Sequence, residues 1–220
     1  MTGLVNPEYI VSHLTNSKWS ESHGAGCGYL GGGILYYAIP YMHKSRVCVC
    51  LGSGGGFVPR MMAQAQRDLK VCGAAAADMR VILVDGNCGV WGRPDWLSES
   101  SFFRTEFPEI DVVTDTTTNA FLRFLKQGLQ VDYLHVDADH SFEGCLTDLR
   151  SYIQLVRCGG IITLHDTAPD RKTACAESTC GVLEEIHVAA AELNLDFVNF
   201  PSVGCGIMIA SKPCTGGNIF

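Results

Sequence analysis

A short apolar run that leads directly into a glycine-rich turn constrains the fold of this chain more than any other feature. Residues 47–51 read Val-Cys-Val-Cys-Leu, and Gly52-Ser-Gly-Gly-Gly56 follows at once. So short a run, stopped by glycines, is typical of a strand buried on both faces of a sheet. Residues 58–69 then have the pattern of a helix. Glycines at such a junction let the backbone turn sharply and approach a ligand closely, so the candidate cofactor-binding residues are Gly52, Ser53, Gly54 and Gly56. An ordinary tight turn between strand and helix is the alternative.

Strand and helix patterns alternate over the rest of the chain. We expect strands at 47–51, 80–84, 110–114, 131–136 and 161–164, and helices at 58–69, 119–127, 143–156 and 182–193. Such alternation gives a parallel sheet with helices on both faces. Two further strands, 196–200 and 206–210, are too close together for a crossover helix and are expected to form a hairpin. The sequence therefore predicts an α/β fold: a Rossmann-like three-layer sandwich with a mostly parallel seven-stranded sheet closed by an antiparallel hairpin strand.

The first 45 residues are expected to form a helical and glycine-rich lid segment, ahead of one cofactor-binding domain at 46–220. Helices are predicted at 7–14, capped by Asn6, and at 34–43, with glycine-rich residues 24–33 between them. Residues 26–31 match a dinucleotide-binding glycine pattern, but no strand precedes them, so a flexible flap is the preferred interpretation. Trp19 and His23 precede this segment and are candidates for a lid.

Acidic residues follow several of the predicted strands. Ligands of open α/β sheets bind outside the carboxyl ends of the strands. Asp85 ends the second strand, about 30 residues after the glycine turn, where a carboxylate can accept hydrogen bonds from both ribose hydroxyls of a cofactor. A solvated turn aspartate is the alternative for Asp85. Asp115, after the third strand, is a further candidate for cofactor binding.

A group of titratable residues follows the fourth and fifth strands. Asp137, Asp139 and His140 come after the fourth strand, and His165 and Asp166 end the fifth. Titratable side chains gathered in a cleft are costly unless they have a task. Asp137 and Asp166 can share a divalent cation, with His165 or Asp139 as further ligands. Carboxylates and water suit Mg²⁺, whereas a histidine ligand would favour Mn²⁺, iron or zinc. Helix capping or direct ligand contact is the alternative to metal binding.

Two stretches resemble class I S-adenosylmethionine-dependent methyltransferases. They are Val131-Asp-Tyr-Leu-His-Val-Asp-Ala-Asp-His-Ser-Phe-Glu143 and Leu155-Val-Arg-Cys-Gly-Gly-Ile-Ile-Thr-Leu-His-Asp166, and the resemblance covers about residues 45–210. The sequence is similar to the small-molecule O-methyltransferase group that includes macrolide-sugar O-methyltransferases and cephalosporin-hydroxylase-like proteins, and more distantly to catechol O-methyltransferase.

The resemblance implies S-adenosylmethionine as the cofactor, bound in part by Asp137, and a small-molecule acceptor. It also implies a Mg²⁺ site at Asp137, His165 and Asp166, in which His165 replaces an acid of the family. Cys50 and Leu51 stand where the family usually has an acidic residue before the glycine turn. Methyl transfer to a hydroxyl requires an aligned acceptor and removal of its proton, for which Asp137, Asp139 and His140 are the catalytic candidates.

Composition narrows the choice of partners. The formal net charge is −7 and no Lys/Arg-rich run occurs, which argues against nucleic acid as the substrate. No apolar run reaches the length of a membrane span, and the N-terminus lacks the pattern of a signal peptide, so a soluble cytoplasmic protein is expected. The eleven cysteines are irregularly spaced and are expected to be reduced structural thiols, with Cys175 and Cys180 the nearest to a separate pair. A homo-oligomer is compatible with the sequence.

Three other functions remain open at this level. An NAD-dependent oxidoreductase shares the strand–glycine–helix unit and the ribose acid. A non-catalytic binding protein can have the same fold. An iron-dependent hydroxylase could use the same acidic residues. Four aromatic residues line either an acceptor pocket or the core: Trp91, Trp96, Phe102 and Phe103.

Overall fold

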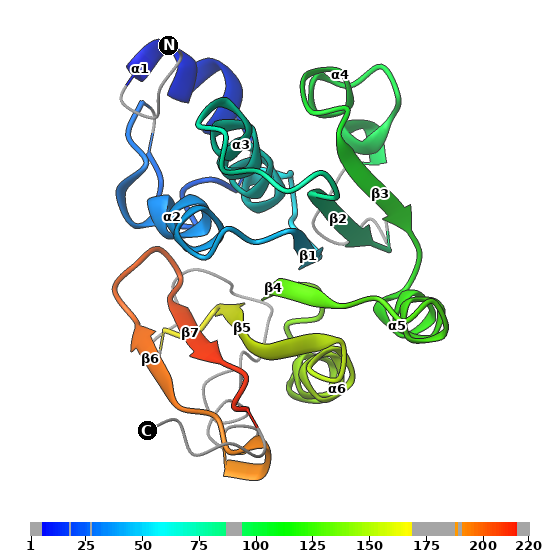
Figure 1. Cartoon of the computed structure of the whole chain (residues 1–220). Helices are drawn as coiled ribbons and strands as arrows, with labels where there is room; N and C mark the ends of the chain where they lie inside the picture. Colours follow the sequence, from blue (N-terminus) through cyan, green and yellow to red (C-terminus); the bar gives the residue numbers. More distant parts are fainter. Residues whose placement is uncertain are drawn as a thin grey trace.

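The computed structural model describes residues 6–17, 19–26, 28–86, 94–168, 188 and 191–214, in which seven strands form one mixed sheet (Figure 1). The strands are β1 (Val47–Leu51), β2 (Arg80–Asp85), β3 (Ile110–Thr114), β4 (Val131–Val136), β5 (Val156–His165), β6 (Phe197–Phe200) and β7 (Ile207–Ser211). Their order across the sheet is β3-β2-β1-β4-β5-β7-β6. Neighbours from β3 to β5 are parallel, whereas β7 is antiparallel to β5 and to β6. The predicted fold class, including the closing hairpin, is confirmed.

Helices cover both faces of this sheet. They are α1 (Pro7–Tyr9), α2 (Leu35–Met42), α3 (Phe57–Val71), α4 (Phe102–Glu106), α5 (Thr117–Lys126) and α6 (Phe142–Tyr152), with shorter turns η1 (Ile10–Leu14), η2 (Gly31–Ile34) and η3 (Pro94–Leu97). Figure 1 shows α2 and α3 on one side of the sheet and α5 and α6 on the other. Successive residues of a strand point to opposite faces. Accordingly, Val49 and Leu51 enter the core beneath α5 and α6, and Cys48 and Cys50 enter the core beneath α3.

The strand register brings three chain segments together at the carboxyl edge of the sheet. Leu51 of β1 lies opposite Val136 of β4, and Val136 lies opposite Leu164 of β5. The residues that follow these strands therefore start side by side. The chain turns in opposite directions from β1 and β4, which makes their junction the place where such sheets bind ligands.

The N-terminal segment lies on the α3 side of the sheet. Asn6 caps its first helix by accepting hydrogen bonds from the backbone N–H groups of Glu8 and Tyr9, as the sequence predicts. The segment also reaches the turn between β6 and β7, because the backbone N–H of Cys205 donates to the carbonyl oxygen of Ser22 over 2.7 Å. The division of the chain into a lid at 1–45 and a domain at 46–220 stays a prediction.

The predicted boundary between the helix at 143–156 and the following strand is wrong. Helix α6 ends at Tyr152, and Val156 already begins β5, where it pairs with Val131. The next partners are Tyr133 and Ile161, so two steps along β4 face five steps along β5. The strand absorbs these extra residues as a local irregularity in which Gly159 adopts a positive φ of 70°. The glycines that suggested a loop therefore lie inside β5. Of the helix predicted at 182–193, only residues 188 and 191–193 lie within the described residues, and they are helical.

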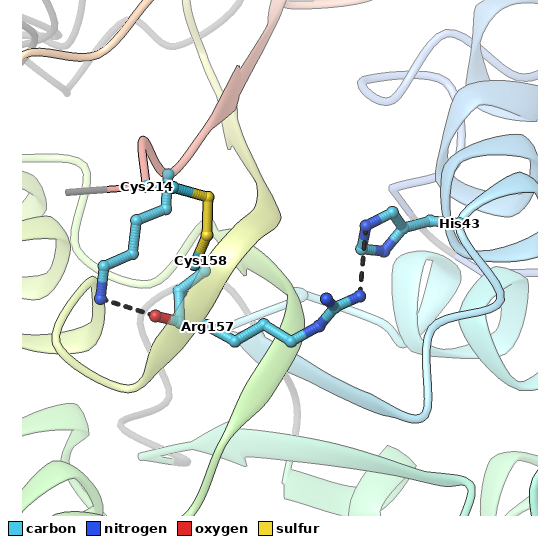
Figure 2. Close-up of a disulfide and its surroundings, with 6 residues drawn as sticks. His43, Arg157, Cys158 and Cys214 are labelled. Carbon is cyan, nitrogen blue, oxygen red and sulfur yellow. Dashed lines mark hydrogen bonds between the residues drawn. A yellow bond between two sulfur atoms is a disulfide. The ribbon is translucent and has the colours of Figure 1, made fainter. Parts of the chain in front are cut away.

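A disulfide joins Cys158 of β5 to Cys214, which follows β7 (Figure 2). The antiparallel pairing of β5 with β7 holds the two Cα atoms 4.9 Å apart, within the range that a disulfide can bridge. Figure 2 also shows the neighbouring Arg157, whose guanidinium lies 3.4 Å from Nε2 of His43. The expectation of reduced thiols is therefore wrong for this pair. It holds for five cysteines of the described part of the chain: Cys48, Cys50, Cys72, Cys145 and Cys205. Cys175 and Cys180 lie outside the described residues.

None of the helices within the described ranges has both the length and the apolar character that crossing a bilayer requires. A cytoplasmic location stays a prediction, and the disulfide is the feature that argues against it, since cytosolic thiols are kept reduced.

Candidate active site

The glycine turn after β1 needs its glycines for backbone conformation. Gly52, Gly54 and Gly56 have φ values of +65°, +59° and +83°, a region that residues with a Cβ rarely adopt. The hydroxyl of Ser53 accepts a hydrogen bond from the backbone N–H of Gly56 over 3.1 Å and so closes the turn. The amino end of α3 follows directly, and the free N–H groups of a helix start favour anionic ligand groups.

The same turn is closely packed on two sides. A Cβ on Gly54 would lie 2.7 Å from the indole ring of Trp19, so the N-terminal segment rests on the turn. A Cβ on Gly56 would lie 2.7 Å from the ring of Phe103 and 2.9 Å from that of Trp96. These two rings pack edge to face, with centroids 5.0 Å apart, and Phe103 is buried. These two rings belong to the hydrophobic core beside the turn. Phe102 is 40% exposed, and Trp91 lies outside the described residues.

The two acids proposed for the cofactor occupy different environments. Asp85 ends β2 next to the end of β1 and is half-buried. Asp115 instead anchors the start of α5, where its carboxylate accepts hydrogen bonds from the side chain of Asn119 and the backbone N–H of Thr116. These two hydrogen bonds lower the pKa of the Asp115 carboxyl. These contacts make Asp115 an anchor for the start of α5, and its role in cofactor binding stays a prediction.

Asp137 lies at the centre of a cluster of histidines. Its side chain is 6% exposed and follows β4 directly. Oδ1 of Asp137 lies 2.9 Å from Nδ1 of His165, and Oδ2 lies 3.1 Å from Nε2 of His23. Nε2 of His140 is farther away, 3.7 Å from Oδ1. A Cβ on Gly52 would lie 2.3 Å from the carbonyl oxygen of Asp137, so the glycine turn and this cluster are in direct contact.

Asp166 closes the cluster on the β5 side. Its carboxylate contacts Nδ1 of His140, and its Oδ1 lies 3.0 Å from Nδ1 of His165. The backbone of Asp166 has a φ of +66°, a sparsely populated conformation that is often found at functional sites. Asp139 lies at the edge: it is exposed and accepts a hydrogen bond from the backbone N–H of Ser141 at the start of α6. A small cavity is lined by Val136, Asp137, Asp139, His140, Cys145, His165 and Asp166.

A protein-family model described as a methyltransferase domain matches residues 49–167, which is more than half of the 220 residues. The matched region contains the glycine turn, Asp85, Asp137 and the end of β5. The chain belongs to this methyltransferase family. The prediction that it is a methyltransferase is thereby confirmed.

Solved structures of methyltransferases share the fold at low sequence identity. The O-methyltransferase from Bacillus cereus, in complex with SAH, is 13% identical with a TM-score of 0.63, over 96% of this chain and 100% of that chain. The O-methyltransferase TomG from Streptomyces achromogenes, involved in tomaymycin synthesis and solved with SAM, is 12% identical with a TM-score of 0.64, over 90% and 88%. Cofactor-bound Rv0187 from MTB is 18% identical with a TM-score of 0.60, over 82% and 78%. A comparison with curated proteins finds no match.

The charges of the cluster in this methyltransferase depend on one another. Burial alone would lower the pKa of His165, but the carboxylates of Asp137 and Asp166 raise it well above its ordinary value. Burial would raise the pKa of the Asp137 carboxyl, yet the neighbouring rings of His165 and His23 hold that pKa well below its ordinary value. The pKa of His140 is raised by Asp166 and Asp137 against the effect of burial. His165 is therefore the resident cation between the two carboxylates.

The geometry distributes the candidate metal ligands differently from the sequence-based set Asp137, His165 and Asp166. One ligand atom each of Asp137, His140 and Asp166 lies within 4.8 Å of the other two. Both ring nitrogens of His165 already face oxygen acceptors, since Nε2 lies 3.0 Å from the carbonyl oxygen of Ser22. The ligand atoms of His165, Asp166 and Cys205 form another such group. His140 is therefore an additional candidate ligand, and the set of Asp137, His165 and Asp166 stays a prediction.

Two histidines of the site carried no site prediction. His23 was expected only in a lid, and its ring in fact stacks on that of His165, with centroids 4.2 Å apart. His135 is fully buried within β4, where it looks like a core residue. Strand alternation was the available signal for His135, because residues 135 and 137 point to the same face.

Proposed function

We propose that this methyltransferase transfers the methyl group of S-adenosylmethionine to a hydroxyl group of a small molecule, with His140 as the general base. The contact between Nδ1 of His140 and the Asp166 carboxylate carries the proposal. That contact orients the ring, and Nε2 remains 3.7 Å from Asp137, too far for a hydrogen bond. A histidine held by a carboxylate at one nitrogen and open at the other is the arrangement that general bases use.

The glycine turn and Asp85 are proposed to hold the cofactor. The turn permits close backbone approach, the start of α3 suits the carboxylate of the methionine part, and Asp85 suits the ribose hydroxyls. The excess of carboxylates near Asp137 suits a positively charged sulfonium. The cofactor-bound relatives support this choice because they share the fold. Asp115 would contribute only by placing α5.

The reaction then proceeds as an in-line displacement. A lone pair of the acceptor oxygen attacks the methyl carbon, and the carbon–sulfur bond breaks with its electron pair going to sulfur. The hydroxyl proton moves to Nε2 of His140, which must be unprotonated before each turnover. Asp137 stabilises the resulting imidazolium across 3.7 Å. Asp139, held at the start of α6, lies at the rim of the cavity, where it would contact the acceptor rather than the methyl group.

A divalent cation fits this site as an auxiliary group. Carboxylates of Asp137 and Asp166 are the ligands that Mg²⁺ prefers, and His140 or His165 as a further ligand would favour Mn²⁺ or Fe²⁺. When bound, such an ion would lower the pKa of the acceptor hydroxyl. The net charge of −7 argues for a small-molecule acceptor rather than a nucleic acid. A homo-oligomer stays compatible with this proposal, and a cytoplasmic location stays a prediction against which the disulfide argues.

Calorimetry tests the cofactor. S-adenosylmethionine and S-adenosylhomocysteine should each bind with a Kd in the micromolar range, about −8 kcal/mol. Asp85→Ala should weaken binding by roughly 1.5–3 kcal/mol without unfolding the protein, because hydrogen bonds to a charged acceptor are lost. The exposed Asp111→Asn serves as the matched control. Binding of NAD in place of both sulfur compounds would overturn the proposal in favour of an oxidoreductase.

Turnover tests the base. A panel of phenols, catechols and sugars is incubated with methyl-labelled cofactor, with and without EDTA, and with Mg²⁺ or Mn²⁺ added back. On the best acceptor, His140→Gln should lower kcat about 10²–10⁴-fold and leave S-adenosylhomocysteine binding unchanged. Full activity of His140→Gln at high pH and at neutral pH would exclude His140 as the base. Loss of activity with EDTA, restored by Mg²⁺, would support the auxiliary cation.

A further inference from the structure

We propose that His23, His135 and Asp137 form a binding site for a divalent first-row transition metal ion, with Zn²⁺ as the reference ion, between the N-terminal segment and β4. One ligand atom of each residue lies within 4.8 Å of the other two. Only Asp137 is shared with the group formed by Asp137, His140 and Asp166. The site depends on neither the cofactor nor the acceptor.

His135 provides the observation that points to a ligand. Its side chain is fully buried, and its Nε2 has no hydrogen-bond partner within the described part of the chain. Buried polar groups left without a partner are rare and call for an explanation such as an ion. The other ring nitrogen, Nδ1, lies 2.8 Å from the hydroxyl of Thr163. A partner at one ring nitrogen that leaves the other free is the usual environment of a metal-binding histidine.

His23 shows the same pattern. Its Nδ1 lies 2.8 Å from the carbonyl oxygen of Trp19, which can only accept, so Nδ1 carries a hydrogen. Nε2 then faces Oδ2 of Asp137 at 3.1 Å. In the neutral ring this places a lone pair against a carboxylate oxygen, which is unfavourable unless a second proton or a metal ion lies between them. A metal ion satisfies Nε2 of His23 and Nε2 of His135 together, whereas a proton on His23 satisfies only one.

Asp137 can serve both neighbouring sites because its two oxygens point to different partners. Oδ1 faces His165 and His140, and Oδ2 faces His23. A cation on the Oδ2 side therefore binds without displacing the contact between Oδ1 and His165.

The distances suit a small ion. Nε2 of His23 and Oδ2 of Asp137 are 3.1 Å apart, and two ligands at about 2.1 Å from one ion would then subtend an angle of about 95°. Ligand atoms on one tetrahedral ion of this kind lie about 3.4 Å apart, and those of His23, His135 and Asp137 lie within 4.8 Å of one another before any ion is bound.

The ligand set selects the class of metal. Two imidazoles and one carboxylate suit zinc, iron, cobalt or manganese, whereas Mg²⁺ prefers oxygen ligands only. The rings of Tyr36 and Phe57 pack beside His23, with centroids 5.5 Å and 5.6 Å away, so this side of the site is apolar, whereas the ring of His165 stacks on His23 at 4.2 Å. A low-polarity shell strengthens the binding of a cation to its charged ligand.

Such an ion would fasten the N-terminal segment to the strand ends. His23 belongs to the same segment as Trp19, whose ring covers Gly54 of the cofactor turn. Metal binding at His23 would therefore favour the arrangement in which this segment covers the turn. Removal of the metal would free the segment without breaking the sheet.

The test uses untagged full-length protein that has been dialysed against chelator and then titrated with Co²⁺, followed by competition with Zn²⁺. We expect the first equivalent of Co²⁺ to bind here, with visible d–d absorption that Zn²⁺ abolishes, before any ion binds at Asp137, His140 and Asp166. His23→Gln and His135→Gln should each weaken Co²⁺ binding at least tenfold. His43 is half-buried and contacts Arg157, away from the proposed site. His43→Gln is therefore the control and should bind Co²⁺ as the unchanged protein does. His140→Gln should also bind Co²⁺ normally.

Two results would overturn the proposal. One is Co²⁺ binding that survives in His23→Gln but is lost in His140→Gln, which would assign the ion to the group of Asp137, His140 and Asp166. The other is less than a tenth of an equivalent of Co²⁺ bound by the folded protein at a tenfold excess. Should His135→Gln not fold, as judged by circular dichroism, His23→Gln decides alone, because His23 lies outside the sheet and its loss breaks no strand.

Discussion

Two aspartates at opposite ends of β4 differ in the kind of partners that surround them. Asp132, near the start of the strand, accepts hydrogen bonds from the backbone N–H groups of Arg46 and Val47 over 2.9 and 2.7 Å and pairs with Arg157. Asp137, just after the end of the strand, has histidines as the ion-pair partners of its carboxylate among the described residues. Both side chains are largely buried, so burial does not distinguish them.

The partners of the two aspartates differ in whether they can lose their protons. Backbone N–H groups and a guanidinium keep their protons at any ordinary pH, so Asp132 has a fixed structural role. Imidazoles can give up a proton or exchange it for a metal ion. The carboxyl end of the sheet is therefore built for chemistry, and its amino end for stability.

Asp137→Asn should have the largest effect of any substitution at the two ends of β4. It removes the carboxylate that charges His165 and faces His140, so we expect a loss of at least about 10³-fold in kcat/KM on the best acceptor, which is about 4 kcal/mol. The amide keeps the shape of the side chain, and the free energy of unfolding should fall by no more than the roughly 3–5 kcal/mol that breaking a buried ion pair costs. Initial rates and urea unfolding measure both quantities. A variant that retains activity but unfolds easily would make Asp137 structural, like Asp132.

Asp132→Asn should show the reverse pattern. The amide cannot accept from two N–H groups and a guanidinium as well as a carboxylate does, and breaking a buried ion pair costs about 3–5 kcal/mol of stability. Activity below the unfolding temperature should stay near that of the unchanged protein. Asp111→Asn removes an exposed pair with Arg80 and should cost less than about 1 kcal/mol. Equal effects of the two substitutions in urea unfolding would mean that the Asp132 network contributes no more than a surface pair.

The disulfide near the amino end of β4 should also act on stability alone. Cys158 and Cys214 close a loop with a sequence separation of 56, far from Asp137, and a disulfide of this kind contributes about 2–4 kcal/mol. Cys158→Ser combined with Cys214→Ser should therefore lower the free energy of unfolding by that amount and leave S-adenosylhomocysteine binding unchanged. Cys72→Ser, at an exposed free thiol, is the control. Weakened cofactor binding in the double variant would show that the two ends of the sheet are coupled.

The sequence revealed the scaffold of the site better than its electrostatics. The bounds of β1 and β4 match the prediction because fully buried strands are uninterrupted apolar runs that end at glycine or aspartate. The start of β5 was missed because its irregularity contains Cys158-Gly-Gly160, which reads as a loop. Pairing of Cys158 with Cys214 depends on the register of β5 and β7, which no local pattern contains.

The roles of the histidines could not be predicted for a similar reason. His23 meets Asp137 across 114 positions of the chain, through the fold of the N-terminal segment. His165 holds both carboxylates only because β4 and β5 are neighbours in the sheet, and its Nε2 is taken by Ser22, again from the N-terminal segment. Local residue types predicted the acids and the glycine turn, whereas the partners of each acid come from distant parts of the chain.

A third aspartate shows what burial does when no cation is near. Asp148 on α6 is 3% exposed, and its Oδ2 has no hydrogen-bond partner among the residues with a described position. Burial raises the pKa of its carboxyl to about 6, opposite to the direction for Asp137. The folded protein therefore holds this proton to a higher pH than the unfolded chain does. The stability from Asp148 is fully present below about pH 4 and is lost as the pH rises to about 6.

Asp148→Asn should abolish this loss of stability with rising pH. Its effect on the free energy of unfolding should be smaller than the effects expected for the three changes above. At pH 7.5 we expect it to increase the free energy of unfolding by about 1–3 kcal/mol, because the amide avoids burying a charge, and at pH 4 the gain should vanish. Urea unfolding of the variant and of the unchanged protein at pH 4, 5, 6 and 7.5 measures the difference between their free energies of unfolding. The titration of the other groups cancels in that difference. A gain that is the same at every pH would mean that packing, not the charge, is responsible. If Asp148→Asn instead lowered the free energy of unfolding at pH 7.5, the Asp148 carboxylate would have a partner that stabilises its charge, as Asp137 does.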